Sequence, residues 1–241
     1  MLMLGSAMII VSGTRTAQYL ITWRDSGSVW RQALAVDPAN YIAHINLGNY
    51  LRDQNQLEEA GSHFREAARL RPTAFQPLLS LARFESSRGA NQRALALYAG
   101  VIQAYPVSFE AHYELGYLQV RQGQVEEGIA HYEHALRSRP HTVATMSNLA
   151  VALTSRKGYQ KRDIARALML AQRAADLTMH QHPDVLFSLS IVYFESGNPS
   201  MAVITAHRAN ALAVESGNQT LVRRIKQYLE HQEDAITRER E

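Results

Sequence analysis

The sequence predicts an all-α fold, a solenoid of antiparallel helix pairs, from an internal repeat and from its composition. The repeat has a period of 34 residues, and the prolines that close its units are Pro38, Pro72, Pro106 and Pro140. A leucine followed by a small residue keeps the same period, at Leu47-Gly48, Leu81-Ala82, Leu115-Gly116 and Leu149-Ala150. The chain is 46% hydrophobic over 241 residues, which is enough for a substantial core. Self-similarity at a fixed period of this length indicates a repeat protein.

Two further columns describe the packing inside each helix pair. Small residues lie in the second helix at Ala60, Ala94 and Gly128, and an aromatic residue follows each after four residues, at Phe64, Tyr98 and Tyr132. Small side chains let the two helices approach closely, and the aromatic ring fills the space at the far end of the pair. Proline ends the second helix, because it lacks the amide hydrogen that would prolong it. One pair cannot bury its apolar face alone, so successive pairs stack.

These columns resemble the tetratricopeptide repeat (TPR) family, over roughly residues 26–214. The resemblance implies a right-handed superhelical solenoid with a half-repeat at its N-terminal end. It implies five full repeats, at 41–74, 75–108, 109–142, 143–182 and 183–216. We therefore expect the TPR solenoid to occupy residues 23–216.

Residues 1–22 form an apolar N-terminal segment, and residues 1–14 carry no charge. Fourteen residues are fewer than the roughly 20 that cross a bilayer as a helix. A signal peptide has a positive region ahead of its apolar part, and none is present here. Three interpretations stay open: an atypical signal, the end of a membrane helix, or a hydrophobic helix that covers the first pair.

The junction that follows contains Trp23, Arg24, Asp25 and Trp30. It is similar to the point at which the last membrane helix of polytopic transmembrane-and-TPR proteins enters their repeats. Those proteins carry a glycosyltransferase-like membrane part. The resemblance implies that residues 1–22 anchor the chain to a membrane, with the repeats in the aqueous phase. A soluble cytoplasmic protein is the alternative.

The repeat changes near its C-terminal end. The small residues of the fourth repeat, Ala167, Ala171 and Ala174, come five residues late, after a longer turn that is rich in Arg and Lys. That basic turn, residues 156–166, is a minor candidate for contact with nucleic acid or anionic lipid. Residues 217–241 follow the last repeat, and we expect a capping helix and a charged tail there. Its apolar stripe consists of Leu221, Ile225, Tyr228 and Leu229.

The sequence contains no catalytic constellation. It has no Cys, hence no disulfide or thiolate metal site, and no phosphate-binding loop or nucleophile elbow. His131 and His134 lie one turn apart, but a metal site needs three or four convergent ligands, so we expect both on the solvated convex surface. We predict a non-enzymatic protein without cofactor or metal.

Function is therefore expected from the first helix of each repeat, which lines the inner wall of a solenoid. The positions that face this groove are Ile45, Asn46, Asn49, Arg52, Leu79, Arg83, Tyr113, Glu114, Tyr117, Arg121, Asn148, Phe187, Ile191 and Phe194. Apolar and aromatic side chains there suit a peptide or a partner helix, although several of them equally suit packing against the next repeat. We predict a protein-protein interaction scaffold. The alternative is a substrate-recognition module of a membrane glycosyltransferase-like protein. The partner's identity and the oligomeric state stay open, and nucleic acid is not the expected ligand.

Overall fold

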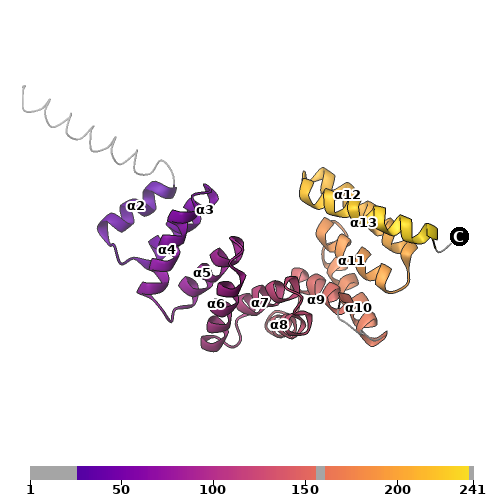
Figure 1. Cartoon of the computed structure of the whole chain (residues 1–241), viewed down its shortest axis with the longest axis horizontal. Helices are drawn as coiled ribbons and strands as arrows, with labels where there is room; N and C mark the ends of the chain where they lie inside the picture. Colours follow the sequence, from indigo (N-terminus) through magenta and orange to yellow (C-terminus); the bar gives the residue numbers. More distant parts are fainter. Residues whose placement is uncertain (1–25, 156–160, 239–241) are drawn as a thin grey trace, which may run out of the picture. The chain divides into compact units, whose positions relative to one another are not determined.

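The computed structural model describes residues 26–155 and 161–238, and the backbone of this part folds into α-helices joined by short turns (Figure 1). In chain order the helices are α2 (Ser26–Val36), α3 (Tyr41–Asp53), α4 (Leu57–Leu70), α5 (Phe75–Ser87), α6 (Asn91–Ala104), α7 (Phe109–Arg121), α8 (Val125–Ser138), α9 (Val143–Ser155), α10 (Lys161–Leu177), α11 (Pro183–Glu195), α12 (Pro199–Glu215) and α13 (Gln219–Arg238). The first helices of the repeats begin at the residues that the 34-residue period predicts. The all-α repeat of helix pairs is thus confirmed.

Local sequence explains where the helices begin and end. Asn40 and Ser108 precede first helices, and their side chains accept hydrogen bonds from the amides of Ala43 (3.0 Å) and Ala111 (3.1 Å). These caps satisfy amides that have no partner inside the helix. The turn between the paired helices α7 and α8 contains Gly123, with a φ of 81°, a left-handed conformation that glycine adopts without strain.

The predicted packing columns are buried. The small residues Ala60 and Ala94 are 0% exposed, and the aromatic residues Phe64, Tyr98 and Tyr132 are each 1% exposed. These side chains form the contact between the two helices of each pair. Because the same residue types recur at the same offsets, each repeat packs in the same way.

The chain divides into two compact units, of which the first ends at Tyr105 and the second begins at Pro106. A core cluster of the first unit contains Leu47, Leu51, Ala60, Phe64 and Phe84, and Trp30 of α2 packs against it. The second unit has its own core, formed by α8 to α13. Leu221, Ile225 and Leu229 of α13 belong to that core, so the apolar stripe of the last helix covers the end of the repeat.

Two sequence-based expectations fall on residues outside the described part. They are the apolar segment 1–22 and most of the turn in the stretch 156–160. Among the helices that the structure describes, none combines the length and the apolar character that crossing a membrane requires.

Candidate partner-binding groove

The second unit contains a cavity of about 1140 Å³ over its first helices. Helix α9 lies between α7 and α11 and contacts both. Each of the three contributes side chains to the cavity, and α13 adds Arg224. We call this cavity the α7–α9–α11 groove. Its apolar and aromatic lining residues include Tyr113, Tyr117, Val120, Tyr132, Val143, Val151, Val185, Phe187 and Ile191.

The aromatic base of the groove is held in place by polar and ring contacts. Asn148 donates a hydrogen bond from Nδ2 to the Tyr113 hydroxyl over 3.3 Å. The Tyr113 ring stacks on Phe109, with centroids 5.9 Å apart, and tilts against Tyr132 at 6.1 Å. Burial, followed by the charge of Glu114, raises the pKa of Tyr113, so its phenol stays neutral. These contacts fix the rings before any ligand arrives.

Two arginines lie over aromatic rings that line the groove. The guanidinium of Arg121 is 5.6 Å from the centroid of the Tyr117 ring, and that of Arg224 is 5.5 Å from Phe187. Phe187 itself is 6% exposed and meets Tyr228 edge-on, with centroids 5.4 Å apart. Phe187 therefore supports the groove wall, whereas Tyr117, which is 41% exposed, is open to a partner.

The groove also contains a buried hydroxyl without a partner. Ser147 is 4% exposed, and its Oγ makes no hydrogen bond within the part of the chain that the structure describes. By contrast, the hydroxyl of Ser188 donates to the carbonyl of Asp184 over 3.0 Å. Buried polar groups are normally hydrogen-bonded, so an unpaired hydroxyl that lines a groove is a potential contact for a ligand.

The structure brings part of the predicted set together. The predicted residues that line this groove are Tyr113, Tyr117, Arg121, Asn148, Phe187 and Ile191. Glu114 and Phe194 are half-buried and lie outside its lining. Binding of a partner by any of them remains a prediction.

The predicted residues of the first unit make contacts of their own. Ile45 packs against the core cluster, Asn46 donates to the carbonyl of Ile42, and Arg52 forms an ion pair with Asp53 over 3.1 Å. Asn49 is half-buried, and Arg83 is exposed but already engaged in another interaction.

Leu79 requires a correction, because it is 2% exposed and cannot line an open groove. It occupies the fifth position of its repeat. The corresponding Ser147 and Phe187 are also buried, whereas Tyr117 at a ninth position is exposed. Fifth positions therefore face the packed interior, and ninth positions face outward.

The histidines also require a correction. His131 is half-buried, not a solvated surface residue, and its Nδ1 lies 2.9 Å from Nδ1 of His112. His112 in turn bonds through Nε2 to the carbonyl of Pro106 over 2.9 Å. His134 is exposed, but its ring stacks on His112 with centroids 4.7 Å apart.

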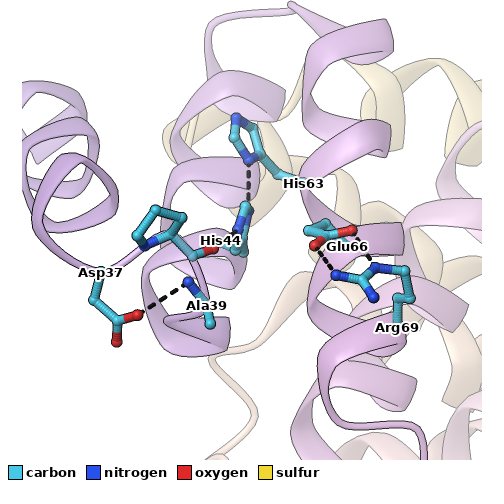
Figure 2. Close-up of polar contacts among 7 residues, drawn as sticks. Asp37, Ala39, His44, His63, Glu66 and Arg69 are labelled. Carbon is cyan, nitrogen blue, oxygen red and sulfur yellow. Dashed lines mark hydrogen bonds and ion pairs between the residues drawn. The ribbon is translucent and has the colours of Figure 1, made fainter.

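The first unit contains the same arrangement. Nδ1 of His44 lies 2.9 Å from Nδ1 of His63, and Nε2 of His44 bonds to the carbonyl of Pro38 over 3.1 Å. Figure 2 shows the two rings pointing toward each other from α3 and α4, next to the ion pair of Glu66 and Arg69. The sequence signal that reveals these histidine pairs is their recurrence after 68 residues, twice the repeat.

The remaining polar clusters show no sign of chemistry. Within residues 26–155 and 161–238, no three His, Asp or Glu side chains converge as a metal site would require. At the basic turn, Arg166 is paired with Glu133 over 2.6 Å. Arg156 and Lys157 lie outside the described residues.

Comparison with known proteins identifies the repeat. The tetratricopeptide repeat model matches residues 23–75 and 79–142. The solved structure of YrrB, described as a TPR protein with an unusual peptide-binding site, is 16% identical, with a TM-score of 0.61 over 84% of this chain and 100% of YrrB. A TPR protein from Parabacteroides merdae is 16% identical, with a TM-score of 0.65 over 90% of this chain and 91% of its own. At this level of identity the likeness concerns the fold.

A curated relative connects the repeat to a larger protein. The protein O-mannosyl-transferase Tmtc2 of Drosophila melanogaster is 36% identical over 67 residues. The matched stretch covers 28% of this chain and 7% of the length of Tmtc2. The repeat fold supports a protein-interaction scaffold and is typically non-catalytic. This chain is built of tetratricopeptide repeats.

Proposed function

We propose that the chain is an interaction scaffold that binds an extended peptide or a partner helix in the α7–α9–α11 groove. The observation that carries this proposal is the groove itself, in which an exposed Tyr117 lies over a fixed aromatic base. Its volume of about 1140 Å³ exceeds the roughly 300–1,000 Å³ of sites for small molecules. Rigid aromatic side chains anchor peptides with little loss of conformational entropy. The peptide-binding site of YrrB, a protein of similar fold, agrees with this role.

Selection of binding peptides from a displayed random library tests the proposal. The affinity of a selected peptide is measured for the whole chain and for Tyr117→Ala. We expect the variant to bind at least about tenfold more weakly, because the exposed ring supplies contact area. Met201→Ala is the matched control, since Met201 is an exposed apolar residue outside the groove lining. Equal losses in both variants would place the binding face elsewhere.

A second candidate function has its own support. The similarity to Tmtc2 and the junction residues Trp23, Arg24 and Asp25 favour a recognition module that belongs to a membrane glycosyltransferase-like protein. In that case residues 1–22 tether the repeats to the membrane. Fractionation of the native gene product tests it. Recovery in the membrane pellet after alkaline washing supports the tether, and recovery in the supernatant rejects it.

A further inference from the structure

Two cations in the α7–α9–α11 groove are available to a ligand. Arg121 and Arg224 line the groove, and within the described part of the chain neither forms an ion pair with a carboxylate. In the same unit Arg139 and Arg166 are paired, each 2.6 Å from a carboxylate oxygen. The two groove arginines thus differ from their neighbours in having no anionic partner.

The stacking of these arginines prepares them for an anion. Each guanidinium lies over an aromatic ring, at 5.6 Å for Arg121 and 5.5 Å for Arg224. Stacking orients the planar guanidinium while its N–H groups stay directed outward, where they can hold a carboxylate through two parallel hydrogen bonds. Less side-chain entropy is then lost when a carboxylate binds.

The surfaces near the arginines suit a polypeptide. The lining between them is apolar and aromatic, and Ile191 and Val151 contribute to it. Ser147 offers a hydroxyl that is buried, unpaired and part of the same lining. A peptide backbone provides both amide hydrogens and carbonyl oxygens, so it can satisfy this hydroxyl.

We propose that the groove binds an acidic peptide segment in which carboxylates flank an apolar or aromatic side chain. This rests on the proposed function, and it assigns a chemistry to the partner. The carboxylates pair with Arg121 and Arg224, and the apolar side chain contacts the ring of Tyr117. Asp184 also lines the groove, so a basic residue is tolerated beside it but an acidic one is repelled.

The test uses peptides selected on the intact chain from a random display library. We expect the selected sequences to be enriched in Asp and Glu around a Leu, Ile, Phe, Tyr or Trp. A selected peptide is then compared with its copy in which every Asp and Glu is replaced by Asn and Gln. The acidic peptide should bind at least about tenfold more tightly at low salt, and this advantage should shrink at high salt.

Charge-neutral variants assign the effect to the two arginines. Arg121→Gln and Arg224→Gln should each reduce the affinity for the acidic peptide several-fold and leave that for the amide copy nearly unchanged. Arg208→Gln is the matched control, because Arg208 is exposed on α12 outside the groove lining and its replacement alters net charge equally. Circular dichroism establishes that each variant is folded.

The outcomes separate this inference from the proposed function. If selected peptides lose affinity with Tyr117→Ala but are not acidic, the acidic preference is wrong and peptide binding stands. The same conclusion follows if Arg208→Gln weakens binding as much as the groove variants do. If no selected peptide depends on Tyr117, the groove is not the binding face, and both proposals fail.

Discussion

His112 and His131 share a single hydrogen bond between their Nδ1 atoms, which lie 2.9 Å apart. A hydrogen bond needs one donor and one acceptor, so only one of the two atoms carries a proton. The other nitrogen of His112 contacts the carbonyl of Pro106, which can only accept, so Nε2 of His112 is the protonated one. Neutral His112 therefore accepts at Nδ1, and His131 donates from Nδ1.

The first prediction concerns the tautomers of both histidine pairs. His112 and His44 should be Nε2–H tautomers, whereas their partners His131 and His63 should be Nδ1–H tautomers. The Pro38 carbonyl imposes the same logic on the first unit as Pro106 does on the second. Long-range proton–nitrogen NMR correlations distinguish the two forms. An Nε2–H tautomer at His63 or His131 would contradict the assignment.

The second prediction is a loss of stability on acidification. Burial, followed by the neighbouring His112 and His134, lowers the pKa of His131 to about 4 from a model value of 6.5. Between these two values the unfolded chain binds a proton that the native His131 does not bind. Stability is therefore full above pH 6.5, falls as the pH drops toward 4, and levels off below. We expect a loss of about 1–2 kcal/mol between pH 7 and pH 5 from this residue.

Urea unfolding of His131→Gln measures this contribution. The glutamine amide can donate to Nδ1 of His112 but does not titrate. The variant should show a smaller loss of stability between the two pH values than the wild-type chain. His141→Gln, which replaces an exposed histidine in a turn, should retain the full loss. The His63 pair adds in the same direction, because burial, then His44 and Arg31, lower the pKa of His63 against an opposing effect of Glu59.

The third prediction concerns the close approach of α7 and α8. A Cβ atom added at Gly116 would lie 2.9 Å from the carbonyl oxygen of Gly128, which is backbone and cannot easily move. Gly116→Ala should destabilise the chain by about 1–2 kcal/mol, since the clash outweighs the roughly 1 kcal/mol gain in helix propensity. Gly100→Ala, on the exposed face of α6, meets nothing within 4 Å and should stabilise by about 0.5–1 kcal/mol. Equal effects in both variants would refute the packing argument.

The fourth prediction tests how the last helix is attached. The hydroxyl of Tyr228 on α13 donates to the carbonyl of Ser190 on α11 over 3.1 Å. Tyr228→Phe keeps the ring and should cost about 0.5–1.5 kcal/mol of unfolding free energy. Tyr193→Phe is the matched control, because the Tyr193 hydroxyl forms no hydrogen bond among the described residues. Similar losses in the two variants would deny the hydrogen bond a role.

Most of the fold could be predicted because each repeat solves its packing problem locally. Residues such as Ala60 and Phe64 are fixed by the distance between two neighbouring helices, so they recur and the period reveals them. The groove was predicted less well. Position in the repeat indicated the helix face, but it did not separate Leu79, which packs inward, from Tyr117, which is exposed.

The histidine pairs and the arginine stacks depend on side-chain rotamers. Whether His131 meets His112 or solvent is decided by rotation about its own bonds and by the position of the Pro106 carbonyl. Sequence spacing places the two residues on facing helices but does not report their contact. Arg121 and Arg224 are separated by more than 100 residues, so their shared groove emerges only from the folded second unit.

The 68-residue recurrence of the histidine pairs has a consequence for how such a chain lengthens. His44 and His63 return as His112 and His131, and Gly48 returns as Gly116, whereas the repeat between them has Leu78, Leu97 and Ala82 in those places. The first and third hairpins are thus more alike than either is to the second. The heritable module is a double hairpin that alternates one histidine-containing pair with one aliphatic pair, so a graft or deletion of 68 residues keeps both types in step where a single 34-residue unit would not.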